Sequence, residues 1–229
     1  SWEKAQYSIN QGLWGTSVGG KETLTSHDSL PESAYPSQVE KQSSEKVSLH
    51  FENGELKAID GVKDTPVNNI IKLQEHAKKF GIGRDTHVGD TIIGIKGRVG
   101  FEAAAPLLII KAHHLLEKHT LSKWQQFQKE QMGNFYGMLL HEGQYLDPVM
   151  RDLEAFLANS QSTVSGKVFV TLHPYRFELT GIESKHDLMN APFGSYGEVN
   201  KGWSADDAKG FIKLLSNQNK IYQYVNKEK

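Results

Sequence analysis

Residues 81–102, with the sequence GIGRDTHVGDTIIGIKGRVGFE, decide the fold of this chain. Gly81 ends an apolar pattern with helical spacing over residues 66–80. The β-branched run over residues 91–96 predicts a short strand. The stretch is a weak dinucleotide-binding motif, because the third glycine is missing and the stretch follows a helix. The stretch therefore joins a helix to a strand.

The residues before this stretch predict a hairpin and a long loop. Apolar residues alternate with polar ones over residues 47–51, and Asn53-Gly54 is a strong turn signal, so residues 47–59 form a β-hairpin. Thr65 and Pro66 are typical of a helix start. Residues 7–20 contain four glycines and predict strand ends and loops. Residues 21–44, rich in Ser, Thr, Glu and Pro, predict an irregular surface loop that is either flexible or functional.

The residues after it predict mainly helices. We expect helices over residues 102–118, with Pro106 in the first turn, and over residues 121–142. A third helix begins at Asp147-Pro148, with Leu153, Phe156 and Leu157 facing inward. Strands are expected at residues 165–172 and 177–181, and a terminal helix at residues 204–225, capped by Ser204. The fold class is therefore α+β, with antiparallel or mixed hairpins, segregated helices and long helices suited to oligomer contacts.

Composition excludes several classes of protein. The 229 residues carry a formal net charge of −1, so no basic field indicates binding to nucleic acid or an anionic membrane. No apolar run approaches the ~20 residues that span a bilayer. The absence of Cys excludes disulfides and is compatible with a reducing, cytoplasmic location. Because the chain begins at Ser1-Trp2 rather than Met, we expect a fragment or an excised domain.

Recognised catalytic motifs are missing from the sequence. His113, His114 and His119 lack the spacing and the carboxylate of a HExxH zinc site, so we expect no metal site. His141 is better explained as the end of a helix. Neither a phosphate-binding GxxxxGK[ST] loop nor a GxSxG elbow is present. The residues alone thus indicate an α+β domain without an assigned activity.

Residues 81–102 resemble the signature of argininosuccinate synthases. Seven positions match that family's pattern: Gly81, Gly83, Arg84, Gly94, Lys96, Arg98 and Glu102. Residues 7–17 resemble its Tyr-Ser-[IM]-Asp-x-Asn-Leu-x-x-x-Ser segment. Residues 111–113 and 165–168 resemble a helix and a strand of the same family. The resemblance covers nearly the whole chain.

The resemblance implies half of an ATP-dependent ligase. Residues 1–229 would be the catalytic and multimerisation domain, and the family's N-terminal ATP-pyrophosphatase domain, with its Ser-Gly-Gly-x-Asp loop, is absent from this chain. That domain would bind most of ATP and its Mg²⁺. The partners implied are citrulline, aspartate and three further copies in a homotetramer. A non-catalytic oligomerisation or small-molecule-binding module with the same fold is the alternative.

The resemblance also implies site residues. Ser8 and Ser17 match serines that hydrogen-bond citrulline, although a turn-capping hydroxyl is the simpler structural role. Arg84, Lys96 and Arg98 match family positions without an assigned ligand. They would bind an anion, remain solvated or form ion pairs between subunits.

Two positions depart from the family's pattern. Gly89 stands where the family has a Glu that accepts from the α-ammonium group of citrulline, and Phe101 replaces a Tyr. Asp85 or Asp90 compensates for this loss, or the substrate carries no α-ammonium group. In the second case we expect an N-acylated citrulline, N-succinyl or N-acetyl, and a succinyl carboxylate would meet one of the three basic residues.

Overall fold

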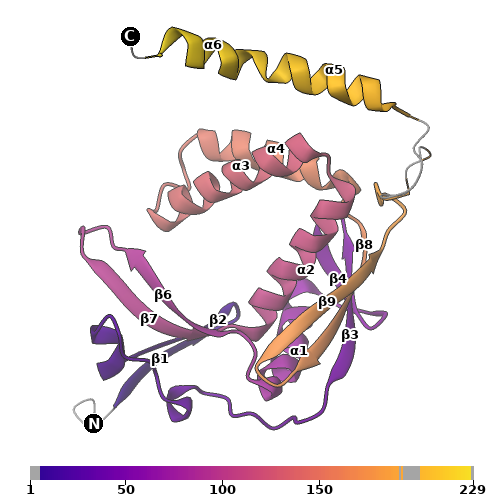
Figure 1. Ribbon diagram of the computed structural model, residues 1–229. Coiled ribbons are helices and arrows are strands. Elements are labelled where there is room, and N and C mark those ends of the chain that lie inside the picture. Colours follow the sequence, from indigo (N-terminus) through magenta and orange to yellow (C-terminus); the bar gives the residue numbers. More distant parts are fainter. Residues whose placement is uncertain (1–5, 191, 193–201, 228–229) are drawn as a thin grey trace. The chain divides into compact units, whose positions relative to one another are not determined.

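Alternating apolar residues build the larger of two antiparallel sheets. The structure, a computed structural model, describes residues 6–190, 192 and 202–227. β3 (Glu45–Glu52) and β4 (Glu55–Ile59) form the predicted hairpin, and Asn53 and Gly54 take positive φ at its turn. β8 (Gly166–His173), β9 (Arg176–Glu183) and β5 (Val62–Lys63) complete the order β5-β4-β3-β8-β9 (Figure 1). The predicted hairpins and the α+β fold class are confirmed.

Two helices cover the apolar face of this sheet. α1 (Pro66–Ala77) is capped by the Thr65 hydroxyl and followed by a 3-10 turn, Lys78–Phe80, which Gly81 ends in the left-handed conformation. α2 (Ala104–Thr120) carries Pro106 in its first turn. Apolar side chains of the helices, the 3-10 turn and the sheet form one buried core, which includes Leu49, Phe51, Leu73, Phe80, Leu108, Leu116 and Leu172. This core was predictable from the apolar periodicity.

The smaller sheet has the order β1-β2-β7-β6 and extends away from the core as an arm (Figure 1). β1 (Tyr7–Gly12) pairs with β2 (Gly15–Gly20), and β7 (Lys96–Glu102) pairs with both β2 and β6 (Arg84–Asp90). The prediction of a strand at residues 91–96 was wrong. Residues 91–95 are the exposed turn between β6 and β7, where Gly94 with φ +82 reverses the chain.

Residues 21–44 contain no strand and only two short 3-10 turns, Lys21–Leu24 and Glu32–Ala34. Leu30 and Ala34 from this segment pack against Val18 of β2 and form a second, small apolar cluster. A Cβ atom at Gly100 of β7 would lie 2.0 Å from Leu30 Cδ1. The segment therefore covers one face of the smaller sheet.

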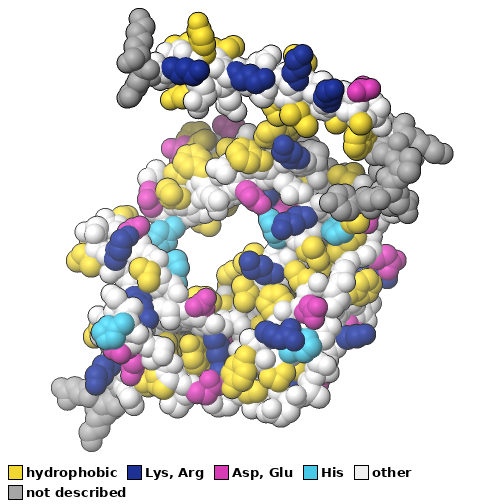
Figure 2. Space-filling model, viewed as in Figure 1, with side chains coloured by type: hydrophobic (Ala, Val, Ile, Leu, Met, Phe, Trp, Pro, Cys, Tyr) yellow, Lys and Arg dark blue, Asp and Glu magenta, His cyan; other side chains and the backbone are white. Residues whose placement is uncertain are grey.

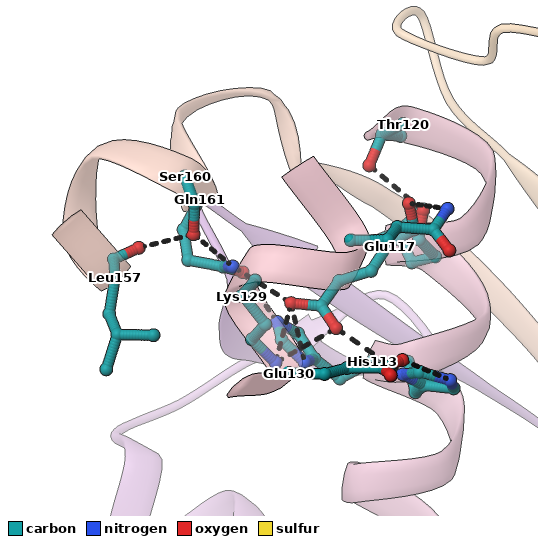
Figure 3. A network of polar contacts seen from close by, with 11 residues as sticks. His113, Glu117, Thr120, Lys129, Glu130, Leu157, Ser160 and Gln161 are labelled. Carbon is teal, nitrogen blue, oxygen red and sulfur yellow. Dashed lines mark hydrogen bonds and ion pairs between the residues drawn. The ribbon is translucent and has the colours of Figure 1, made fainter. Parts of the chain in front are cut away.

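A polar network around Glu117 of α2 holds α3 (Lys123–His141), which buries none of its own side chains (Figure 3). The Glu117 side chain is 2% exposed and accepts from Lys129 Nζ at 2.8 Å and from Gln161 Nε2 at 2.9 Å. Gln161 Oε1 lies 2.7 Å from His113 Nε2. Burial lowers the pKa of His113, against the opposing charge of Glu117. The network fixes the direction of α3, and His141 is its last residue.

The predicted inward faces of the later helices were only partly right. In α4 (Val149–Ser160) Leu153 is buried, but Phe156 is 39% exposed. The apolar residues Trp124, Phe127 and Met138 of α3 are also exposed. Periodicity identifies an apolar side of a helix but does not say whether the same chain covers it.

The terminal helix forms two segments, α5 (Ala205–Leu215) and α6 (Asn217–Val225), which meet at Ser216. Ser204 caps α5 as predicted. The chain divides into two compact units, residues 1–187 and 188–229. Within the described residues, no helix is long and apolar enough to cross a membrane. Residues 1–5, on which the prediction of a fragment rests, lie outside the described part.

Candidate functional site

The predicted substrate residues share one face of the smaller sheet. Paired residues of adjacent strands project to the same side, and residues two apart on one strand do likewise. Ser17 pairs with Phe101, Ser8 with Gly19, and Gly89 with Gly97. We call the side that these pairs define the open face; it consists of Ser8, Asn10, Ser17, Gly19, Asp85, His87, Gly89, Gly97, Val99 and Phe101.

The two serine hydroxyls are available to a ligand. Ser8 lies within β1 and Ser17 within β2, so neither caps a turn. Among the described residues, no side-chain hydrogen bond engages either hydroxyl, and Ser8 is exposed. Phe101, directly opposite Ser17, is half-buried and presents a ring without a hydroxyl group. The simpler role of a turn-capping hydroxyl therefore does not describe these serines.

Arg84, Lys96 and Arg98 project from the opposite side, the covered face, because they alternate with the residues of the open face. Arg98 donates to the carbonyl oxygens of Glu22 at 2.9 Å, Thr25 at 2.5 Å and Asp28 at 2.7 Å. It thereby fixes the irregular segment 21–44 against the sheet.

Arg84 has a buried carboxylate partner of its own. Its side chain is 7% exposed, and its Nε atom lies 3.0 Å from Oε2 of Glu102, which is 2% exposed. It also pairs with Glu32 and stacks 4.7 Å from the centroid of the Tyr35 ring. Lys96 pairs with Asp90 at 2.5 Å near the end of the hairpin. The structure thus gives all three basic residues protein partners, away from the serines.

The two candidates for a compensating carboxylate differ in position. Asp90 lies on the covered face and pairs with Lys96, and β6 and β7 pair from Arg84 to Asp90 without a shift of register. Asp85 lies on the open face beside Phe101. At ~3.3 Å per residue, Asp85 is about 13 Å from Gly89 along the strand. Neither carboxylate occupies the place of Gly89.

A cavity of about 570 Å³ opens at Gly89. The cavity lies at the edge of the sheet and is lined from both faces: His87, Gly97 and Val99 belong to the open face, and Val88, Asp90 and Arg98 to the covered face. Thr91 and His141, at the end of α3, complete the lining. In the space-filling view the molecule is hollowed between the β6–β7 arm and the helices α2 and α3 (Figure 2). Gly89 and Gly97 are paired, so the floor of the cavity at that point is bare backbone.

His87 and His141 were missed by sequence reasoning. The period-2 alternation along β6 places His87 beside Gly89, but this signal is usable only once residues 84–90 are recognised as a strand. His141 approaches through the orientation of α3, which no local pattern specifies. Within the described residues, no group of three or more His, Asp or Glu side chains is arranged to hold a metal ion.

Comparison with known proteins gives the family of this chain. The model of the family described as the arginosuccinate synthase C-terminal domain matches residues 7–222. The chain belongs to the argininosuccinate synthase family. The match includes all four strands of the sheet that carries the open face.

Individual argininosuccinate synthases are similar along nearly the whole chain. The protein from Xanthomonas campestris is 34% identical over 96% of this chain and 56% of its own length. The proteins from Dictyoglomus thermophilum and Methanocaldococcus jannaschii are each 33% identical, over 96% and 99% of this chain. The chain spans 55 to 58% of the length of these relatives.

Proposed function

We propose that this chain is the substrate-binding and multimerisation half of an ATP-dependent ligase in arginine biosynthesis. The ligase condenses citrulline, or an N-acyl derivative, with aspartate and releases AMP and pyrophosphate. The observation that carries the proposal is the open face, which unites Ser8, Ser17, Gly89 and Phe101 within the region matched by the family. An unrelated role for this face would not require those four positions to share one side.

The charges of the open face support a model in which this domain binds citrulline and another domain binds ATP. In the reaction the ureido oxygen of the citrulline attacks the α-phosphorus of ATP, pyrophosphate leaves, and the aspartate amine then displaces AMP. The open face contains no Lys or Arg that would neutralise phosphate oxygens. We therefore propose that ATP and its Mg²⁺ are bound mainly by an ATP-pyrophosphatase domain outside this chain. The serine hydroxyls hold the citrulline so that its ureido oxygen meets the nucleotide.

The missing carboxylate at Gly89 bears on the substrate. An α-ammonium group bound there would have no carboxylate partner, and leaving such a charge unpaired costs about 1–3 kcal/mol or more. A citrulline whose α-nitrogen is acylated carries no charge at that atom and needs additional room. The cavity at Gly89 supplies that room. We propose N-succinyl- or N-acetylcitrulline as the preferred substrate.

The terminal helices support assembly into a homotetramer. Phe211, Leu214, Leu215 and Tyr224 are each more than 60% exposed, and neither α5 nor α6 buries a residue. Exposed apolar faces of this kind are typical of protein interfaces. Because its reaction consumes ATP and aspartate, we place the enzyme in the cytoplasm.

The test is pyrophosphate release by the full-length protein that contains this chain. ATP and aspartate are supplied with citrulline, N-acetylcitrulline or N-succinylcitrulline. We expect release that depends on one of the citrullines and on aspartate. Ser17→Ala should raise KM for that substrate roughly three- to tenfold, the value of one hydrogen bond. Lys96→Ala, on the covered face, is the matched control and should leave KM unchanged. No release with any citrulline would refute the proposal.

A further inference from the structure

His87 occupies the space above Gly89. A Cβ atom built on Gly89 would lie 2.7 Å from His87 Nε2. Any side chain at residue 89 therefore competes with the imidazole ring in its present position. The two residues are two apart on β6 and act as one unit, in which glycine makes room and histidine supplies the polar group.

This unit changes the chemistry offered to a ligand. A carboxylate only accepts hydrogen bonds, whereas a neutral imidazole donates one and accepts one, and a charged imidazole donates two. His141, which also lines the cavity, offers the same groups. Among the described residues that line the cavity, Asp90 alone carries a carboxylate, and it is paired with Lys96 at 2.5 Å. The cavity thus presents imidazole N–H donors to an anionic group and offers an ammonium group no unpaired carboxylate.

We propose that His87, together with His141, binds a hydrogen-bond-accepting, anionic group on the α-nitrogen of the substrate. This inference rests on the proposed function and deepens it. An N-acyl group that ends in a carboxylate accepts hydrogen bonds from both imidazoles, and its chain lies beside the His87 ring, over the bare backbone of Gly97. His87 is then a specificity-determining residue. Arg98 also lines the cavity, but its guanidinium donates to three carbonyl oxygens of segment 21–44.

The experiment compares variants of the full-length protein by pyrophosphate release and by calorimetric titration with N-succinylcitrulline, N-acetylcitrulline and citrulline. His87→Ala should raise KM for the succinyl substrate about tenfold with little change in kcat. His87→Gln, which keeps an N–H donor, should recover most of that loss. The acetyl substrate, which has no second carboxylate, should be affected less.

Asp85→Asn is the control on the same strand and the same face. The inference is overturned if wild-type protein prefers free citrulline and the Asp85→Asn substitution raises KM for citrulline tenfold. Asp85 would then hold the ammonium group. It is also overturned if His87→Ala leaves KM for N-succinylcitrulline unchanged while turnover persists. If wild-type protein neither turns over nor binds any of the three citrullines, the proposed function fails and the inference fails with it.

Discussion

At the scale of single residues, two glycines of the 81–102 stretch share a backbone conformation but not their surroundings. Gly83 and Gly94 both have φ +82. A Cβ atom at Gly83 would lie 2.6 Å from the backbone of Ala103 and Ala104, where α2 begins, whereas at Gly94 it would meet nothing within 4 Å. Gly83 is therefore required for close packing, and Gly94 only for the turn.

Alanine substitutions separate these two requirements. Gly94→Ala should destabilise the protein by about 1–2 kcal/mol, the cost of the left-handed backbone alone. Gly83→Ala should cost about 3 kcal/mol or more, because backbone atoms must also move. Urea unfolding of both variants measures the difference. Equal losses would show that the contact between Gly83 and the start of α2 is not close.

Two basic residues of β7 provide a second comparison. Arg98→Ala removes the donors to three carbonyl oxygens of segment 21–44 and should cost about 1–3 kcal/mol. Lys96→Ala breaks an exposed ion pair and should cost less than about 1 kcal/mol. Limited proteolysis should cut segment 21–44 faster in the Arg98 variant alone. Cleavage at the same rate in both variants would contradict the role given to Arg98.

At the scale of elements, the sequence predicted the turns, caps and helix ends that depend on local patterns. The hairpin at Asn53-Gly54, the cap at Thr65 and the helix end at Gly81 were all foreseen, because each is set by its own backbone chemistry. The strand misplaced at residues 91–96 shows the limit. β-branched residues favour strands, but at Gly94 the chain reverses and residues 91–95 form a turn. The strands that flank this turn, β6 and β7, show little alternation of apolar and polar residues.

The candidate site was foreseen only in part for the same reason. Ser8, Ser17, Gly89 and Phe101 followed from the resemblance, and the pairing of β1, β2, β7 and β6 brings them to one face. The face of the sheet on which Arg84, Lys96 and Arg98 lie depends on strand register. A strand predicted one residue out of place puts each side chain on the opposite face. His141 depends on the long-range packing of α3, which no local pattern records.

His113, where α2, α3 and residues 161–163 meet, should make the stability of the fold depend on pH. Burial lowers the pKa of His113 in the folded protein. His113 thus contributes stability that is complete above its unfolded value of ~6.5 and is lost as the pH falls toward its folded pKa. Between pH 7.5 and 5.5, wild-type protein should lose stability faster than His113→Gln, by at most about 1.4 kcal/mol per pH unit. Parallel curves from chemical unfolding would contradict this assignment.

At the scale of the whole molecule, the two compact units should separate in function. The main apolar core lies entirely within residues 47–172, so a chain that ends at Asp187 should keep a cooperative thermal transition. Without α5 and α6 it should form a smaller oligomer than the intact chain, because their exposed apolar residues are the proposed contacts. Light scattering after size-exclusion chromatography measures both masses. An unchanged oligomer would place the contacts elsewhere.

The central claim is that the open face of the β1-β2-β7-β6 sheet binds the citrulline part of the substrate. A crystal structure of the full-length protein with bound N-succinylcitrulline tests it most directly. We predict the ligand on the open face, within hydrogen-bond distance of the Ser8 and Ser17 hydroxyls, with its acyl group between His87 and His141. A ligand bound on the covered face, or away from this sheet, would contradict the account.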